Sequence, residues 1–298
     1  MLIAGFFLFG LIFGSFLNVC IYRMPRGLSV VRPRSACPAC NAPIAGYDNI
    51  PVLSWLILGG KCRHCRARIS PRYATVELLT GALFLLSYLA TDSLPEAAKY
   101  CVFSFLLIGL IFTDAETKLL PDLLTKPGIV LGLLFSVFVF VEGPAAWLME
   151  RWGDFDWRLL SFINSLVGAI FGAAFILGVA FLYQALRGVE GMGMGDAKLM
   201  AMIGAFLGIK LTLLVLLLAT LTGSMFGMLL MLLVWRKRIA RRRERSSEPA
   251  HVVRAKAWHS AKLIFRNFQI PFGVFLGTAA AFAAFLGMRL VHWYLGLY

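Results

Sequence analysis

The sequence is poor in charge, and acidic residues are its scarcest charged class. Only 15% of the 298 residues are charged, and 15 Asp and Glu stand against 29 Lys and Arg. With 60% hydrophobic residues and a mean hydropathy of +0.80, the composition excludes a soluble globular protein. Several apolar runs reach or approach the roughly 20 residues that a helix needs to cross a bilayer. The composition therefore predicts an all-α polytopic membrane protein.

Several familiar sequence signals are also missing. The first apolar run, residues 1–22, lacks both a basic n-region and a small-residue cleavage site, so we expect a retained helix rather than a signal peptide. No glycine-rich loop follows a strand, so no dinucleotide-type fingerprint marks a cofactor site. No internal repeat is present. The formal charge of +14 comes from Lys and Arg crowded into two segments, which is typical of cytoplasmic loops and predicts no nucleic-acid partner.

The positions of the apolar runs predict about eight transmembrane helices. Residues 197–235 are too long for one crossing and just long enough for two, with a turn near Gly208 and Lys210. Two crossings also place both basic segments on one side, as the positive-inside rule requires. Those segments, 23–72 and 236–266, hold nine bases against one acid and eleven against two. The expected helices are 1–22, 74–90, 97–113, 128–141, 159–186, 197–209, 211–235 and 271–293.

The predicted topology divides the chain into three domains. Residues 1–22 form the first transmembrane helix, and residues 23–73 form a small cytoplasmic module. Residues 74–298 form a seven-helix membrane domain in which 236–270 is a basic cytoplasmic loop. We expect that loop to face anionic lipid on the cytoplasmic side. The segment 142–158, rich in tryptophan, is expected at the opposite membrane interface.

Four of the six cysteines form a CxxC…CxxC pattern. The two pairs, Cys37 with Cys40 and Cys62 with Cys65, are separated by twenty-one residues. This spacing predicts a tetrahedral zinc site with four thiolate ligands. Two disulfides are the alternative, which a reducing cytoplasmic location disfavours. Four thiolates leave no open coordination position, so we expect a structural zinc ion that supplies folding energy to a module with little core.

The most unusual polar stretch lies between two long apolar runs, at Gly193-Met194-Gly195-Asp196-Ala197-Lys198. An ionisable group at the edge of a hydrocarbon phase is a functional candidate by default, although Asp is also a favoured N-cap. Asp114 is a second candidate because it stands at the C-terminal end of a predicted helix, where a negative charge is disfavoured. Both acids are predicted at the cytoplasmic membrane face. A pair of carboxylates there suits general acid–base chemistry.

Other acids near this face have simpler explanations. Asp122 is the rival partner for Asp196, but Leu-Pro-Asp-Leu is typical of a helix N-terminal turn. Glu77 is expected to be solvated. Lys198 and the N-terminal end of its helix are expected to favour ionised Asp196, leaving the proton on Asp114.

The chain resembles the type IV prepilin peptidase family of membrane aspartic proteases over nearly its whole length. The GxGD motif alone is shared with presenilin-like proteases, but the full set of motifs is specific. Besides the two CxxC pairs, the resemblance is carried by Gly14-Ser15-Phe16-Leu17-Asn18-Val19, Tyr22-Arg23, Pro25, Ile50-Pro51, Ser54-Trp55-Leu56, Arg72-Tyr73, Val76-Glu77-Leu78-Leu79, Asp114, Leu120-Pro121-Asp122, Gly193–Asp196 and Lys198.

The resemblance implies an enzyme of the bacterial inner membrane. It implies cleavage of the short basic leader of prepilins and pseudopilins just after a glycine, with Asp114 and Asp196 as catalytic residues and Gly193, Gly195 and Lys198 in support. Members with the cysteine module commonly also N-methylate the new terminus with S-adenosylmethionine; no motif here marks the donor's binding residues. The basic stretch 236–266 is longer than the family's usual link.

Two other classes of function compete with this one. A proton- or cation-coupled transporter would use intramembrane carboxylates as a relay, but it predicts acids near the bilayer midplane and gives no reason for four cysteines. A membrane-anchored binding protein would use the zinc knuckle and the Arg-rich loop to contact nucleic acid or anionic lipid. That reading leaves the two aspartates unexplained.

Overall fold

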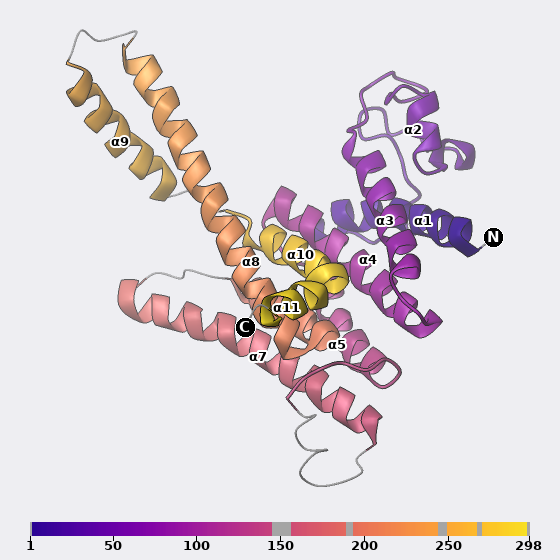
Figure 1. Ribbon diagram of the computed structural model, residues 1–298. Coiled ribbons are helices and arrows are strands. Elements are labelled where there is room, and N and C mark those ends of the chain that lie inside the picture. The colour runs from indigo at the N-terminus through magenta and orange to yellow at the C-terminus, as the bar shows by residue number, and fades with distance from the viewer. Residues whose placement is uncertain (1, 145–155, 189–192, 244–248, 267–269, 297–298) are drawn as a thin grey trace.

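The computed structural model describes residues 2–144, 156–188, 193–243, 249–266 and 270–296, and these residues are almost entirely helical. Sheet structure in them is limited to two isolated β-bridges. Short turns accompany the main helices at η1 (Met24–Arg26), η2 (Gly46–Asn49), α2 (Leu53–Ile57) and the π-helical η3 (Ala283–Gly287). The main helices, shown in Figure 1, are α1 (Leu2–Arg23), α3 (Arg72–Leu89), α4 (Leu94–Thr117), α5 (Asp122–Ser136), α7 (Trp157–Arg187), α8 (Met194–Arg243), α9 (Ala250–Arg266), α10 (Phe272–Phe282) and α11 (Met288–Leu295).

Helix α8 is broken at Gly208, close to the turn expected near Lys210. Gly208 has φ 73° and ψ 176°, which lies outside the helical region. A Cβ at this position would stand 2.6 Å from the carbonyl oxygen of Glu142, so only glycine fits the break. The helix therefore consists of two segments, 194–207 and 209–243.

The apolar runs that the sequence predicts as helices fall largely within helices of the described residues, while the number of membrane crossings stays a prediction. These helices are α1, α3, α4, α5, α7, the two segments of α8, and α10 continued through η3 into α11. The expected 128–141 helix is shifted, since α5 begins at Asp122 and ends at Ser136. Among the described residues, five helices are long and apolar enough to cross a membrane: Leu2–Arg26, Leu94–Thr117, Trp157–Arg187, Met194–Arg243 and Phe272–Leu295.

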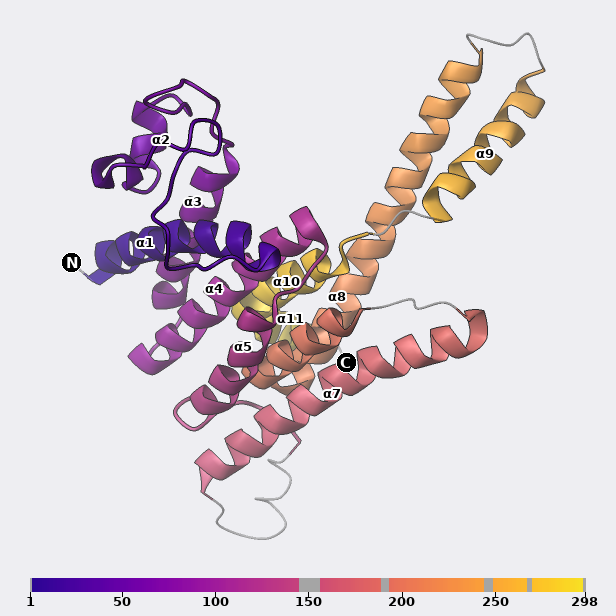
Figure 2. The same ribbon diagram turned by 180° about the vertical axis from the view of Figure 1, so that it is seen from behind.

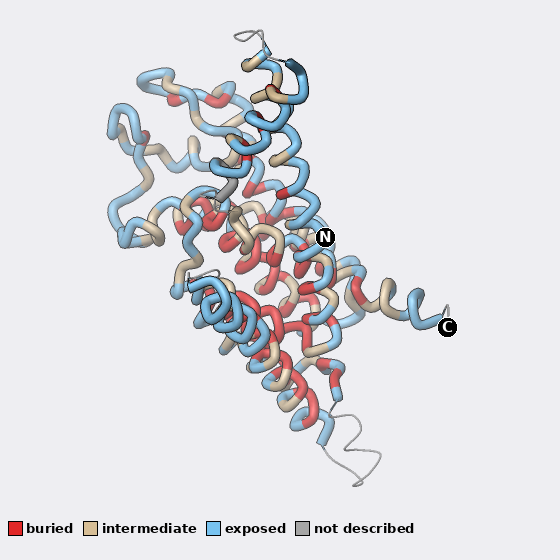
Figure 3. The backbone as a smooth tube through the Cα atoms, turned by 90° about the vertical axis from the view of Figure 1, so that its left-hand side faces the viewer, coloured by how far each residue is buried: buried red, intermediate tan, exposed pale blue. Residues whose placement is uncertain are grey.

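The core is centred on the first segment of α8. Every residue from Leu199 to Leu207 is buried. Helices α5, α7 and α10 pack against α8, and Figure 3 shows the buried residues concentrated in the helical body. Helix α7 approaches α8 through glycines. A Cβ on Gly168 would clash with the carbonyl oxygen of Gly204 and stand 2.9 Å from the Cα of Gly208. Such small-residue contacts let backbones approach closely where lipid supplies no hydrophobic driving force between helices.

The basic segment 236–266 is not the loop that the sequence predicts. Residues 236–243 continue α8, and α9 runs back beside them, so that Figures 1 and 2 show a two-helix arm projecting from the body. Val253, Ala257 and Ala261 of α9 are buried. The ring of Trp235 meets that of Trp258 edge-on at 5.8 Å. The apolar run ends at Trp235, but Arg, Lys and Ala are good helix formers and carry the helix onward. Of the tryptophan-rich segment 142–158, residues 145–155 lie outside the described part of the chain.

Candidate active site and metal centre

The four expected metal ligands come together in the module between α1 and α3. The Sγ atoms of Cys37, Cys40, Cys62 and Cys65 all lie within 4.8 Å of one another. The Sγ atoms of Cys37 and Cys65 are 3.8 Å apart. Tetrahedral Zn–S bonds of about 2.3 Å place neighbouring sulfurs about 3.8 Å apart, so the donor set fits one zinc ion. All six cysteines are described and none forms a disulfide.

The two halves of the metal centre are built alike. Each CxxC turn is followed by a residue with positive φ, Asn41 at 55° and Arg66 at 58°. The backbone N–H of that residue donates to the carbonyl of the first cysteine, at 2.8 Å to Cys37 and 3.1 Å to Cys62. Each turn is closed by one β-bridge, Ala36 with Pro43 and Lys61 with Arg68. Two such turns facing each other supply two ligands each.

Backbone amides of the turns tune the thiols. The N–H groups of Ala39 and Cys40 lower the pKa of Cys37 to about 7. The N–H groups of Cys65 and His64 likewise lower the pKa of Cys62. At Cys65 the amide of Ala67 also favours the thiolate, but burial and hydrogen bonds with the other cysteines raise its pKa to about 11. Four thiolates this close repel one another, and a divalent metal ion offsets that repulsion.

Polar contacts at the junction of the module and the membrane helices were missed by sequence reasoning. Glu77, expected to be solvated, is buried on α3 and accepts a 2.7 Å hydrogen bond from the N–H of Val52. Asn18 of α1, also buried, donates to the carbonyl of Tyr73 at 2.9 Å. Arg72, the first residue of α3, forms an ion pair with Glu116 in the last turn of α4. Asn18, Arg72 and Glu77 belong to the motifs that carry the family resemblance, but the sequence alone does not indicate their partners.

Asp114 lies in the last turn of α4, which ends at Thr117. Its side chain is buried, and Oδ2 accepts a 3.1 Å hydrogen bond from the N–H of Val274 in the first turn of α10. A helix N-terminus favours negative charge, so α10 opposes the unfavourable effect of the α4 C-terminus on Asp114. This contact cannot be predicted from local sequence patterns, because 160 residues separate its partners.

Asp196 lies in the first turn of α8, as the sequence predicts. Its N–H donates to the carbonyl of Gly193 at 3.1 Å, which closes the turn through the GxGD stretch. The Asp196 side chain is half-buried, and its carboxyl is near enough to that of Asp114 for their charges to interact. The two expected carboxylates therefore lie near one another, at the ends of two different helices.

Lys198 does not have the partner that the sequence suggests. Its Nζ lies 2.6 Å from Oδ1 of Asp122, so its charge is directed to the start of α5. Asp122 is exposed and also pairs with Lys126 at 2.7 Å, which fits the helix N-terminal role expected for it. That Lys198 favours ionised Asp196 stays a prediction, and this pairing does not support it. The N–H of Val274 donates to Asp114 and therefore favours its ionised form as well. Local charges thus no longer indicate which of the two aspartates holds the proton.

The loop between α4 and α5 brings one apolar side chain to this site. Leu120 is half-buried, and its Cβ would stand 3.1 Å from a Cβ built on Gly195. Its Cδ2 would stand 3.2 Å from a Cβ built on Gly273, in the first turn of α10. The same Cβ on Gly273 would lie 2.8 Å from Oδ2 of Asp114. The Leu120 side chain thus lies between the two segments that carry and hold the aspartates.

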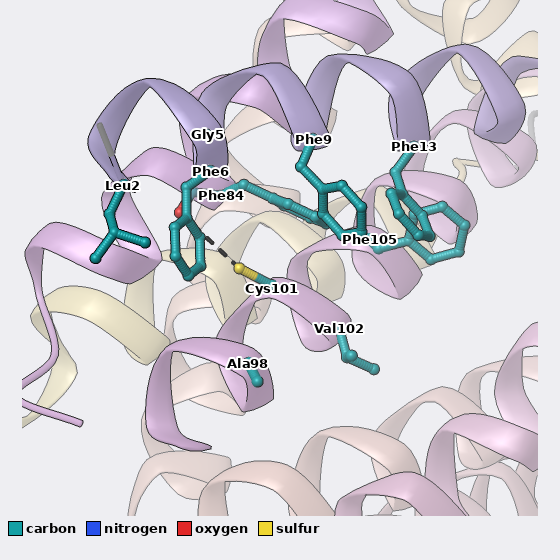
Figure 4. A pocket seen from close by; sticks show the side chains of 10 residues that line it. All are labelled: Leu2, Gly5, Phe6, Phe9, Phe13, Phe84, Ala98, Cys101, Val102 and Phe105. Atoms are coloured by element: carbon teal, nitrogen blue, oxygen red, sulfur yellow. Dashed lines mark hydrogen bonds between the residues drawn. The ribbon is translucent and has the colours of Figure 1, made fainter. Parts of the chain in front are cut away.

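A separate cavity of about 470 Å³ lies between α1, α3 and α4 (Figure 4). Its lining is apolar apart from the thiol of Cys101, which points to the carbonyl of Phe84 at 3.9 Å. S-adenosylmethionine carries an ammonium, a carboxylate and a sulfonium that need polar partners. The lining offers none, so this cavity does not fit the methyl donor. It is lined by Leu2, Gly5, Phe6, Phe9, Phe13, Phe84, Ala98, Cys101, Val102 and Phe105.

Comparisons with known proteins identify the family of the chain. Residues 8–91 match the model of the "Bacterial Peptidase A24 N-terminal domain", and residues 101–228 match that of the "Type IV leader peptidase family". A prepilin leader peptidase/N-methyltransferase of Aeromonas hydrophila is 34% identical, covering 97% of this chain and 92% of that protein. One from Klebsiella pneumoniae is 41% identical over 68% of this chain and 83% of its own length. No solved structure matches the chain. The identity shared over nearly the whole length shows that the chain belongs to the type IV leader peptidase family.

Proposed function

We propose that the chain is a prepilin leader peptidase whose catalytic residues are Asp114 and Asp196. The observation that carries this proposal is the meeting of the two carboxyls at one site from the last turn of α4 and the first turn of α8. The substrate is the basic leader of a prepilin or pseudopilin, cut just after a glycine. The relatives are named for this activity.

The paired carboxyls suit hydrolysis of a peptide bond. One carboxylate takes a proton from water, and the oxygen attacks the carbonyl carbon of the scissile bond. The other carboxyl polarises that carbonyl and gives its proton to the nitrogen, so that the C–N bond breaks into an acid and an amine. The N–H of Val274 keeps Oδ2 of Asp114 in place. A pair this close titrates as a unit, so the two roles belong to the pair rather than to a fixed residue.

The site belongs at the cytoplasmic face of the bacterial inner membrane. Eight crossings place the basic segments 23–72 and 236–266 on one side, together with both aspartates. The two acids lie at helix ends rather than at mid-helix, which argues for surface chemistry over a transmembrane proton relay. The Arg-rich arm formed by 236–243 and α9 is suited to anionic lipid on that side.

The zinc ion, held by Cys37, Cys40, Cys62 and Cys65, is structural. Four protein ligands close its coordination sphere, so it stabilises the module and does no chemistry on the leader. N-methylation of the new terminus, with S-adenosylmethionine as donor, is the second proposed activity. It rests on the names of the relatives.

The test is cleavage of a prepilin by the purified protein in detergent or liposomes. Asp114→Asn and Asp196→Asn should each lower the rate about 10³-fold or more while leader binding is largely kept, because an amide cannot exchange the proton. Asp122→Asn is the matched control, since its exposed carboxylate pairs with Lys126 and Lys198 outside the pair. Full activity in either of the first two variants would exclude the dyad.

A further inference from the structure

Leu120 narrows the space beside the aspartates. Its side chain stands against Gly195, one residue before Asp196, and against Gly273, whose neighbour Val274 holds Asp114. Neither glycine has a side chain, and a Cβ on Gly195 or on Gly273 would stand only 3.1 or 3.2 Å from Leu120. Leu120 is therefore an apolar side chain beside both the segment that carries Asp196 and the segment that holds Asp114.

A peptide cut here brings one residue very close to that wall. Its carbonyl must lie within about 3 Å of the carboxyls that attack and polarise it. In the residue that contributes this carbonyl, the Cα is bonded to the carbonyl carbon. A Cβ on that residue lies only about 2.5 Å from the carbonyl carbon. A side chain at this residue therefore enters the space next to Leu120, whereas side chains of the other residues of the peptide start further from the carbonyl carbon.

We propose that Leu120 is a specificity-determining residue that excludes side chains from the residue before the scissile bond. This inference rests on the proposed function and gives a physical reason for a glycine at that position. Leu120 selects by steric exclusion and takes no part in proton transfer. Gly195 and Gly273 contribute only backbone atoms to this space. Leu120 contributes a side chain, which a substitution can shorten.

The experiment compares prepilins that carry Gly, Ala or Val before the cleaved bond, using the full-length protein. We expect Leu120→Ala to change the ratio of two cleavage rates, that of the prepilin with Ala before the bond to that of the prepilin with Gly. This ratio should rise roughly tenfold or more over wild type, as expected when a pocket gains the room of a few methyl groups. The Val substrate should gain less than the Ala substrate. Leu120→Met, which conserves volume, should keep the wild-type ratio.

Leu119→Ala is the matched control, because Leu119 is the neighbouring residue and 55% exposed. It should leave the ratio unchanged. If Leu120→Ala loses its fold, which its zinc content and thermal unfolding report, Leu120→Val provides the same comparison with a smaller trim and should raise the ratio in the same direction.

The outcomes separate this inference from the proposed function. If wild type cleaves no prepilin, the proposed function fails. If wild type cleaves and both trimmed variants cut the Gly substrate with an unchanged ratio, the role of Leu120 is wrong and the dyad stands. An equal rise for Ala and Val would indicate general loosening of the loop, and it would also overturn steric exclusion by Leu120.

Discussion

The zinc module and the membrane core are held together in opposite ways. In the core, the residues from Leu199 to Leu207 are all buried, and α7 touches α8 backbone to backbone at Gly168 and Gly204. In the module, large apolar side chains such as Tyr47 and Ile57 remain 67% and 72% exposed. Figure 3 shows buried residues concentrated in the helical body. The module replaces packing with a cluster of four thiols.

This difference shows which of the two regions positions the aspartates. Packing around α8 and α10 fixes Asp196 and the N–H that holds Asp114, because Asp196 and Val274 lie in the first turns of these two helices and both helices contribute residues to the core. The module contributes through its attachment at Glu77 and Arg72 rather than through the carboxyls. Damage to the core should therefore remove the fold and cleavage together, whereas damage to the module should first remove the metal.

The largest effect is expected from crowding the core. Gly168→Leu would drive a side chain into the backbone of Gly204 and should destabilise the protein by about 3 kcal/mol or more. Thermal unfolding and cleavage in detergent measure it. Gly178→Leu, on the same helix, is the control, since a Cβ there meets nothing within 4 Å. Similar stability in the two variants would mean that the α7–α8 contact does not hold the core.

An intermediate effect is expected from removing the metal. Cys37→Ser/Cys62→Ser should lower the zinc content from about one per chain to near zero and unfold the module, since metal binding supplies its folding energy. The membrane core should keep its unfolding temperature. Elemental analysis and protease sensitivity of residues 23–72 measure the two regions separately.

Cys101→Ala is the control for that variant, because Cys101 lies in α4, outside the cluster. It should keep its zinc. If the zinc-free protein kept its module protease-resistant yet lost all cleavage, a purely structural metal would be contradicted.

The two regions also differ in how well the sequence predicts them. The four cysteines of the metal centre lie within 29 residues of chain, so their spacing in the sequence predicts that they cluster. Asp114 and Asp196 were found because a charge beside an apolar run is unusual. Their surroundings were not found: the Asp114–Val274 bond spans 160 residues and the Lys198–Asp122 pair spans 76. Hydropathy also predicts that a helix ends where its apolar residues end, which is why the sequence predicts a loop beyond Trp235 where α8 continues to Arg243.

The smallest effect is expected at the junction of the two regions, where Arg72 pairs with Glu116 two residues beyond Asp114. The Arg72 side chain is only 14% exposed, so water screens the pair incompletely. Arg72→Ala should raise the activation free energy of cleavage by about 1 kcal/mol, which lowers the cleavage rate roughly fivefold. Zinc content and leader binding should be retained. Lys210→Ala, which removes the more exposed pair with Glu142, is the matched control and should change cleavage little.

A positioning role differs from mere stability in its response to charge reversal. Arg72→Glu should lower the rate further than Arg72→Ala, because Glu116 then faces a like charge next to the last turn of α4. Adding Glu116→Arg restores an opposite pair and should recover most of the loss. Recovery in the double variant, measured as rate at saturating substrate, would show that the module helps to align the catalytic helix through this contact. If the reversed pair were as slow as Arg72→Glu alone, the module and the core would be coupled elsewhere, through Glu77 or Asn18.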